Sequence, residues 1–246
     1  MAPLLELNHV TKRFGQVVVA RDVSFTIEDG AAVGIVGPNG AGKTTLFGVM
    51  SGDLRADSGQ VRLAGRDVTR LDAAERTRLG IGRTYQVPRP FSGMTVFENL
   101  LVAAQQGGER RGAASHSLAA SALERARLSE RANLRAGQLG LLDRKRLELA
   151  RALATRPRVL LLDEVAGGLT EPEVREVVGI VRETLAEGVA VVWIEHVVRA
   201  LLASVERLMC LADGAVIGDG EPREVLSSPA VREVYLGSEA AFEAAS

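Results

Sequence analysis

The stretch GPNGAGKTT, residues 37–45, combines three glycines, one lysine and two threonines, and it directly follows the apolar run AAVGIV at 31–36. It matches the pattern G-x-x-x-x-G-K-[ST], whose fixed positions are Gly37, Gly42, Lys43 and Thr44. Glycines let successive backbone N–H groups turn toward phosphate oxygens, and the N-terminus of a following helix adds the positive end of its dipole. The stretch therefore predicts a phosphate-binding loop between a strand and a helix at 43–51.

The side chains of this loop define a nucleotide site. We expect Lys43 to reach the β- and γ-phosphates of ATP and the hydroxyl of Thr44 to ligate Mg²⁺. The alternative is a glycine-rich turn without a ligand, and the apolar run before the loop favours phosphate binding over it. The predicted nucleotide contacts in the loop are Gly37, Pro38, Asn39, Gly40, Ala41, Gly42, Lys43, Thr44 and Thr45.

Two carboxylates end a second apolar run, VLLLDE at 159–164. A strand that is buried on both faces of a parallel sheet has such a continuous apolar sequence. Alone, this pair is typical of a solvated strand end. With the glycine loop upstream, we expect Asp163 to hold Mg²⁺ through water and Glu164 to orient or deprotonate an attacking water.

A histidine ends the next apolar run, VVWIEH at 191–196. The carboxyl ends of parallel strands gather at one edge of a sheet, where ligands bind. We expect this edge to place His196 near the γ-phosphate, where it donates a hydrogen bond to the developing charge. A structural role is the alternative for His196, and it is the expected role of His9 and His116.

The composition is that of a globular protein without strong charge. Thirty basic and 31 acidic residues give a net charge of -1, which argues against broad nucleic-acid binding. The single cysteine, Cys210, excludes an intrachain disulfide and fits a reducing cytosol. No run approaches the roughly 20 apolar residues of a membrane-spanning helix. If the protein acts at a membrane, we expect it to do so by binding to another subunit.

Strand and helix patterns alternate along much of the chain, which predicts an α/β fold. Residues 87–153 are richer in alanine, leucine, arginine and glutamate, and they read as a helical insertion. Within it, residues 107–117 are expected to form an exposed loop or a flexible joint. The predicted strands are 4–10, 17–28, 31–37, 59–65, 79–86, 158–164 and 189–196, with a hairpin at 207–220. The predicted helices are 43–51, 95–106, 117–128 and 171–188, with one more between residue 196 and the hairpin, and residues 221–246 are also expected to be helical.

With the glycine loop, Gln86, the Asp163-Glu164 pair and His196 in this order, the chain resembles the ATP-binding subunits of ABC transporters from about residue 4 to 237. The stretches MTVFENLLVAA, KRLELARALAT, LLDEVAGGLTEPE and VREVYLG most resemble the ATPases of branched-chain amino acid importers. The resemblance implies one ATPase domain of the P-loop NTPase (RecA-like) class. Its core sheet and N-terminal antiparallel β subdomain would comprise 4–86 and 154–237, its helical subdomain 87–153, and its tail 238–246.

The same resemblance implies roles for individual residues. Phe14 matches the aromatic residue that stacks on adenine; the alternative is a core phenylalanine. Gln86 matches the residue that senses Mg²⁺ and the γ-phosphate, Glu164 the catalytic base and His196 the switch histidine. The candidate catalytic set is therefore Glu164, His196 and Gln86, and the candidate metal set is Thr44, Gln86 and Asp163.

The chain departs from the family at its signature, Leu-Ser-Gly-Gly-Gln, where residues 139–143 read LGLLD. The serine is absent, and leucines replace both glycines, so their Cβ atoms restrict backbone approach to phosphate. Asp143 replaces a neutral amide, or else caps a helix that begins at Arg144. Because each signature in this family faces the nucleotide of the partner subunit, we hypothesise a heterodimer with one slow composite site.

The resemblance thus implies the ATP-hydrolysing motor of a multi-subunit importer for branched-chain amino acids or similar small polar solutes. Expected cofactors are ATP and Mg²⁺. Expected partners are a second ATPase subunit in a head-to-tail hetero- or homodimer, transmembrane permease subunits and, indirectly, a solute-binding protein, with no nucleic acid. The expected location is peripheral, on the cytoplasmic face of the inner membrane. The alternatives are urea-import or lipopolysaccharide-export ATPases, a soluble ATPase of repair or translation, and a regulatory module.

Overall fold

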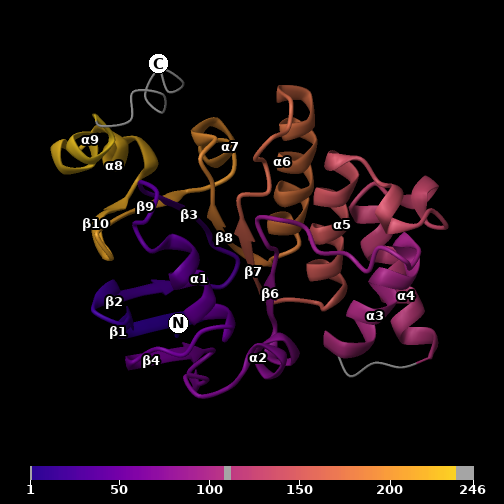
Figure 1. The fold of residues 1–246 in the computed structure, drawn as a ribbon, viewed down its shortest axis with the longest axis horizontal. Coiled ribbons are helices and arrows are strands. Elements are labelled where there is room, and N and C mark those ends of the chain that lie inside the picture. Colours follow the sequence, from indigo (N-terminus) through magenta and orange to yellow (C-terminus); the bar gives the residue numbers. More distant parts are fainter. Residues whose placement is uncertain (1, 108–111, 237–246) are drawn as a thin grey trace.

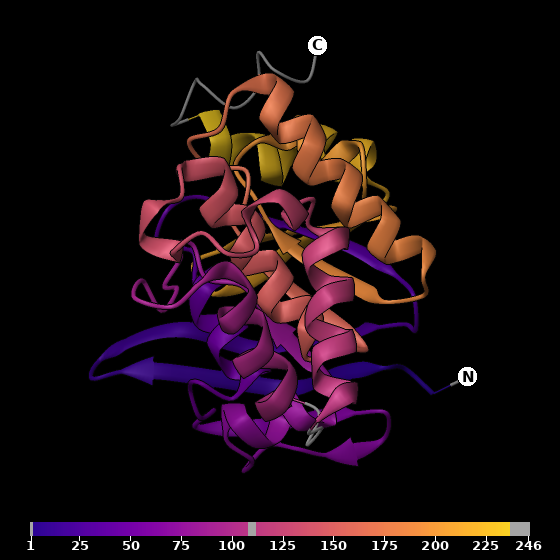
Figure 2. The same cartoon turned by 90° about the vertical axis from the view of Figure 1, so that its right-hand side faces the viewer.

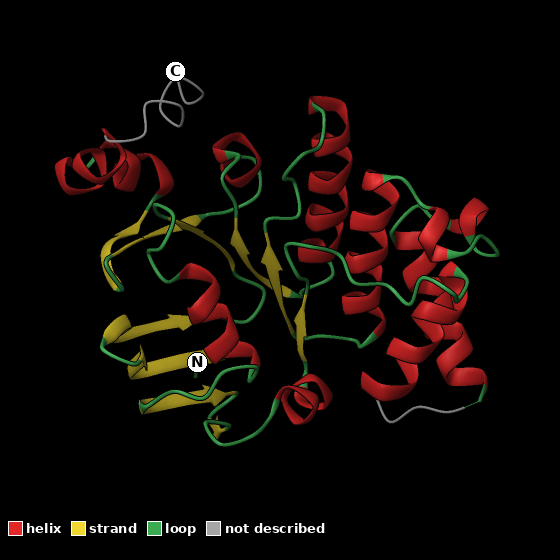
Figure 3. Cartoon of the chain, viewed as in Figure 1, coloured by secondary structure: helices red, strands yellow, loops and turns green. Residues whose placement is uncertain are grey.

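The structure, a computed structural model, describes residues 2–107 and 112–236 of the 246-residue chain. The expected tail at 238–246 therefore lies outside the described residues. Two sheets organise the chain (Figure 1, Figure 3). The first is antiparallel, in the order β2-β1-β4-β5, with β1 at Leu5–Phe14, β2 at Val17–Ile27, β4 at Ser58–Leu63 and β5 at Arg66–Asp67.

The second sheet has six strands in the order β10-β9-β3-β8-β7-β6. Its pairs are parallel except for the hairpin of β9 and β10 at one edge. Every residue of β3, β7 and β8 is buried, as their continuous apolar sequences predict. The strands are β3 at Ala32–Val36, β6 at Ile81–Arg83, β7 at Val159–Asp163, β8 at Ala190–Ile194, β9 at Arg207–Ala212 and β10 at Ala215–Gly220.

Alternate residues of the parallel strands enter two different apolar clusters, because successive side chains point to opposite faces. One face packs with α1 (Lys43–Ser51) and the antiparallel sheet, and Phe47 and Met50 of α1 are fully buried there. The other face packs against α6 (Glu171–Ala186), α7 (Val198–Leu202) and one side of α5 (Leu141–Ala154). The glycine loop at the end of β3 is thus anchored by packing on both sides.

A third apolar cluster holds α3 (Val96–Gly107), α4 (Ala113–Arg125) and the other side of α5 together. These three helices, called the helical lobe here, lie toward the right-hand end of the molecule in Figure 1 and face the viewer in Figure 2. The predicted loop at 107–117 is wrong at 107 and at 113–117, which are helical, whereas Gly112 lies in a turn. Gly107 ends α3, and α4 begins at Ala113, where the hydroxyl of Ser115 donates to the carbonyl of Gly112. Residues 108–111 lie outside the described part.

The remaining helices are short, and the sequence patterns missed one of them. This is α2 (Ala73–Leu79), whose capping box is formed by Asp72 and Glu75. The predicted terminal helices are α8 (Pro222–Ser227) and α9 (Pro229–Leu236). No helix in the described ranges is long and apolar enough to span a bilayer.

Candidate functional site

The glycine loop between β3 and α1 requires glycine at two positions for backbone reasons. Gly37 and Gly42 have φ of 151° and 99°. A Cβ at Gly37 would lie 2.1 Å from the carbonyl oxygen of Leu211, and one at Gly42 would lie 2.2 Å from that of Val19. Neighbouring strands therefore press the loop into its curve. The first amides of α1 have no carbonyl one turn earlier in the helix, so they are available to an anion.

Lys43, the first residue of α1, is folded back into this loop. Its side chain is buried, and its Nζ donates to the carbonyl oxygens of Gly37 at 2.7 Å and Pro38 at 3.0 Å. Burial lowers the pKa of Lys43, while the carboxylates of Glu164 and Asp163 oppose that shift. The loop therefore holds a positive charge at its centre, opposite the two strand-end carboxylates.

Asp163 ends β7 and is 1% exposed. Its Oδ2 accepts from Nη2 of Arg83 at 3.3 Å, whereas its Oδ1 is buried with no hydrogen-bond partner among the described residues. Burial raises the pKa of Asp163, and the Arg83 guanidinium opposes this. A buried carboxylate oxygen without a partner fits a cation ligand, directly or through water.

The three predicted metal ligands line one cavity of about 660 Å³, which contains Thr44, Gln86 and Asp163. A hydroxyl, an amide and a carboxylate form an oxygen donor set that suits Mg²⁺. Arg83 also lines this cavity, and sequence reasoning missed it. Its guanidinium lies between Asp53 and Asp163 and over the rings of Phe47 and Tyr85.

Of the three predicted catalytic side chains, Gln86 and His196 each contact the third, Glu164. Glu164 follows β7 and accepts from the amide Nε2 of Gln86 through Oε2. Its Oε1 lies 3.0 Å from Nε2 of His196. His196 itself lies two residues beyond the end of β8 rather than within the strand as predicted. Residues 78 and 32 positions away in sequence thus meet at one carboxylate.

Two further buried charged residues hold the loops around Glu164, and the sequence analysis assigned neither a role. Lys145 of α5 donates to the backbone carbonyls of Gln86 and Glu164. Glu195 accepts from the backbone N–H groups of Ala166 at 2.9 Å and His196 at 3.0 Å. Asp163 and Glu164 could be predicted because two adjacent acidic residues end an apolar run. The roles of Lys145 and Glu195 could not be predicted in this way, because their contacts depend on tertiary packing.

Phe14 lies at the end of β1, away from the apolar core. It is 49% exposed, which contradicts the alternative of a core phenylalanine. The ammonium of Lys12 lies 5.4 Å from the centroid of its ring. An exposed ring is available to stack on a base.

The divergent signature forms the start of α5. The alternative that Asp143 caps a helix beginning at Arg144 is wrong, because the helix begins at Leu141 with Gly140 as its N-cap. Asp143 instead lies in the first turn, where its carboxylate contacts Arg146 at 3.3 Å and Arg131 at 3.4 Å. Leu141 is 49% exposed. The position that is glycine in the family signature is therefore an apolar surface side chain here.

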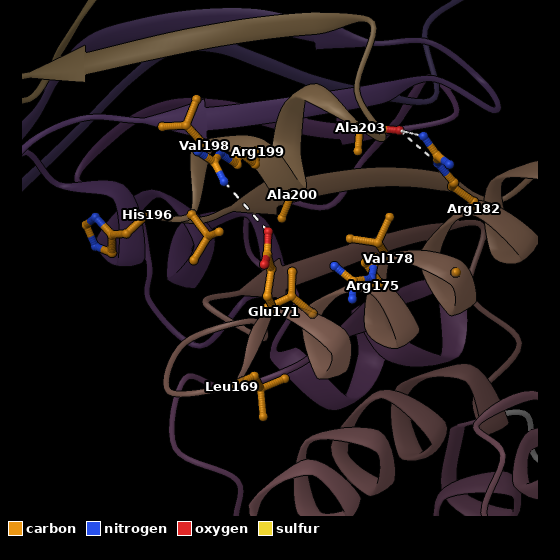
Figure 4. A pocket seen from close by; sticks show the side chains of 13 residues that line it. Leu169, Glu171, Arg175, Val178, Arg182, His196, Val198, Arg199, Ala200 and Ala203 are labelled. Carbon is orange, nitrogen blue, oxygen red and sulfur yellow. Dashed lines mark hydrogen bonds and ion pairs between the residues drawn. The ribbon is translucent and has the colours of Figure 1, made fainter. Parts of the chain in front are cut away.

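A second cavity, of about 760 Å³, lies between α6 and α7 and borders His196 (Figure 4). Its wall is mostly apolar, and its arginines include Arg182, which donates to the carbonyl of Ala203. Neither Lys43 nor the Asp163-Glu164 pair lines it. The cavity is therefore separate from the phosphate-binding loop.

Comparison with known proteins identifies the family of the chain. The ABC transporter family model matches residues 20–167, and the branched-chain amino acid ATP-binding cassette transporter model matches residues 215–241. The chain is 38% identical to the lipopolysaccharide export system ATP-binding protein LptB of Acidithiobacillus ferridurans, over 97% of this chain and 99% of that protein. It is 34% identical to the high-affinity branched-chain amino acid transport ATP-binding protein BraF of Pseudomonas aeruginosa, over 96% of this chain and 98% of that protein.

Solved structures give the same result for the fold. An ADP conformation of an ATP-binding cassette of an ABC transporter matches with a TM-score of 0.86 and 31% identity, over 97% of this chain and 100% of that chain. A dimeric cassette in a post-hydrolysis state bound to ADP and Pi matches with a TM-score of 0.80 and 26% identity, over 89% and 99%. The predicted P-loop NTPase fold is confirmed. The chain belongs to the ABC transporter family, as one of its ATP-hydrolysing, nucleotide-binding subunits.

Proposed function

We propose that the chain drives the import of branched-chain amino acids or similar small polar solutes. It works as the ATPase subunit of an importer, bound through permease subunits to the cytoplasmic face of the inner membrane and served by a solute-binding protein. The match of residues 215–241 to the branched-chain amino acid cassette supports this system, as does the similarity to BraF. The contact of Glu164 with both Gln86 and His196 carries the hydrolytic part of the proposal.

The hydrolytic site is assembled from the phosphate-binding loop and the strand ends. The loop amides and Lys43 bind the β- and γ-phosphates, and Phe14 stacks on adenine. Thr44, Gln86 and Asp163 would hold Mg²⁺, which would neutralise phosphate charge. Glu164 accepts a proton from the attacking water, and His196 donates a hydrogen bond toward the phosphate oxygens. Each of these roles can be tested by substituting a single residue.

The working unit is a head-to-tail dimer of two ATPase subunits. The dimeric cassette to which this chain is similar supports a dimer. Leu141 and Leu142 stand where the family signature has glycines, so this chain's signature serves the partner's nucleotide poorly. A heterodimer with a different second ATPase subunit would keep one efficient site, formed by Lys43 and Glu164 of this chain and the partner's signature. Residues 87–153 would act as the helical subdomain of a single domain spanning 4–237.

Lipopolysaccharide export is the second candidate system, because the chain is 38% identical to LptB. The solute is selected by the membrane subunits, so the two candidates differ in the partners that this chain accepts. A regulatory module without hydrolysis is disfavoured by the arrangement of Gln86 and His196 around Glu164.

The test uses the assembled transporter in lipid vesicles. Wild-type complex should release phosphate faster when a leucine-loaded binding protein is added, and Glu164→Gln should abolish most of that turnover. Turnover that survives Glu164→Gln would place the main catalytic site elsewhere. Stimulation by lipopolysaccharide instead of the loaded binding protein would replace the import proposal by export.

A further inference from the structure

Lys145 is a buried cation that phosphate binding does not use. It lies near the start of α5, is 5% exposed, and donates from Nζ to the carbonyl oxygens of Gln86 at 3.0 Å and Glu164 at 2.8 Å. A buried ammonium is costly unless hydrogen bonds and opposite charges compensate it. Burial lowers the pKa of Lys145, and the carboxylates of Glu195 and Glu164 oppose that shift.

Its two acceptors are the backbones of residues whose side chains contact each other. Gln86 donates through its amide to Glu164, although 78 positions separate them in sequence. One ammonium therefore joins the backbones of the two residues whose side chains are in contact. The position of a side chain depends on how firmly its backbone is held. The Lys145 bridge therefore helps to fix the position of the Glu164 carboxylate.

The backbone of Glu164 also needs outside support. Its φ of 49° is in the left-handed region, which a residue other than glycine adopts only when its surroundings impose it. Its N–H donates to the carbonyl of Ile194 at 2.9 Å, and its own carbonyl accepts from Lys145. Hydrogen bonds on both sides of the Cα thus hold the conformation that turns the carboxylate toward Gln86 and His196.

The helix that carries Lys145 belongs to two apolar clusters. Leu149 of α5 packs in the cluster under the parallel sheet, and Leu147 packs among the helices of the lobe. In Figure 1, α5 stands between α6 and the pair α3 and α4. A change in the angle of α5 against the sheet would therefore move the Lys145 ammonium relative to its two carbonyls.

We propose that Lys145 is a positioning residue for ATP hydrolysis, which fixes the backbones of Gln86 and Glu164 and makes their alignment depend on the placement of α5. This inference rests on the proposed role of Glu164 as the base. It adds that the helical lobe contributes a charged group to the alignment of that base. Among the described residues, Lys145 donates to the carbonyls of Gln86 and Glu164 and not to the predicted nucleotide contacts Lys43 and Thr44, so nucleotide affinity should be largely independent of it.

The test compares Lys145→Met, Lys145→Gln and Lys145→Arg in the assembled transporter. We expect Lys145→Met to lower kcat by about 10- to 100-fold, the scale of a misplacement of about 1 Å, while the KM for ATP changes less than about twofold. Lys145→Arg keeps the charge and should recover most of the loss. Hydrogen exchange on the full chain should become faster at 84–87 and 163–167 in Lys145→Met.

Arg76 provides the matched control, because it is also a buried cation that holds backbone carbonyls. It is 1% exposed and donates to Met50 at 2.9 Å and Thr69 at 3.0 Å, away from Glu164. Arg76→Met should lower the melting temperature and speed exchange near 49–50 and 69–71, with kcat per folded complex kept within about twofold. If Lys145 only stabilised the fold, Lys145→Met would likewise lower the melting temperature and leave kcat per folded complex within about twofold of wild type.

The outcomes distinguish failure of the positioning role of Lys145 from failure of the proposed function. If Glu164→Gln abolishes turnover while folded Lys145→Met keeps wild-type kcat, the positioning role is overturned and the proposed function stands. If Glu164→Gln leaves turnover intact, the proposed function fails first. Should Lys145→Met not fold, Lys145→Gln decides the matter, because its amide is too short to bridge both carbonyls. A parallel loss of kcat in Arg76→Met would also overturn the inference.

Discussion

Nε2 of His196 lies 3.0 Å from Oε1 of Glu164, while Gln86 donates to the other oxygen of the same carboxylate. Both oxygens of the candidate base are therefore held by side chains from other segments. The side chain of His196 is 48% exposed, whereas that of Glu164 is 17% exposed. His196 can be replaced without opening the core, which separates its catalytic contribution from its structural one.

We expect His196→Ala to lower kcat by about 100-fold, the usual scale for loss of one positioned proton or hydrogen-bond donor. The KM for ATP should change little, because the phosphate-binding loop is untouched. The measurement is phosphate release by the assembled transporter across ATP concentrations. His116→Ala is the control: His116 lies on α4, where its ring contacts Gly112, and its replacement should leave kcat unchanged. A His196→Ala complex with more than half of wild-type kcat would contradict the assignment.

The sequence predicted the parts of the site that depend on local patterns. The glycine loop, the helix at 43–51 and the Asp163-Glu164 strand end are all read within a few residues, since apolar runs and glycines specify them locally. The strand-end pattern also predicted the position of His196, and the resemblance added the role of Gln86. The structure shows that these two side chains meet at Glu164.

The sequence failed where distant contacts decide. Nothing near Lys145 or Arg83 in the chain indicates that each reaches the ends of β7, because their acceptors lie far away in sequence. The start of α5 was misplaced by three residues because Asp143 resembles a cap, whereas Gly140 occupies that position. Helix α2 was missed, although its capping box at Asp72 and Glu75 was a readable signal.

Gly42→Ala should be far more disruptive than Gly40→Ala. Both glycines have positive φ, 99° and 82°, and each alanine would incur a strain of about 1–2 kcal/mol for that reason. Only Gly42 also faces backbone: its Cβ would lie 2.2 Å from the carbonyl oxygen of Val19, whereas nothing lies within 4 Å at Gly40. Urea unfolding of the full chain should show the larger loss for Gly42→Ala. Equal losses would mean that β2 does not press on the loop.

Glu195 gives stability a pH dependence of known sign. It is 2% exposed, and burial raises its pKa above the ordinary value of 4.5. The folded chain therefore binds this proton more tightly than the unfolded chain, so the contribution of Glu195 is complete below 4.5 and is lost as pH rises through the raised pKa. Because Glu195→Gln does not ionise, we expect this variant to gain stability relative to wild type as pH rises from 4.5 to 8.

Glu173→Gln is the control with the opposite sign. Glu173 lies in the first turn of α6, and hydrogen bonds from Thr170 lower its pKa below the ordinary 4.5. Its contribution is complete above that value and is lost as pH falls through the lowered pKa, so Glu173→Gln should lose stability relative to wild type as pH rises toward 4.5 and show no further trend above it. Urea unfolding of the full chain without nucleotide, repeated from below pH 4.5 up to pH 8, measures both trends. The same trend in both variants would refute the assignment of the buried charge.

Phe14→Ala should weaken ATP binding through the base and not through the phosphates. The ring of Phe14 is 49% exposed at the end of β1, and stacking of a base on an aromatic ring contributes about 1–3 kcal/mol. We therefore expect a loss of roughly 5- to 150-fold in the affinity for Mg-ATP, measured by calorimetry on the full chain. Phe14→Tyr keeps a stacking surface and should bind as wild type does.

Inorganic tripolyphosphate separates the two halves of the ligand in the same experiment. It offers the phosphates without adenine, so its affinity should be unaffected by Phe14→Ala and abolished by Lys43→Ala, which removes the charge that is folded into the loop. ATP binding should be lost with Lys43→Ala as well. If Phe14→Ala weakened tripolyphosphate and ATP equally, the ring would be supporting the fold near the glycine loop, and adenine would have to bind elsewhere.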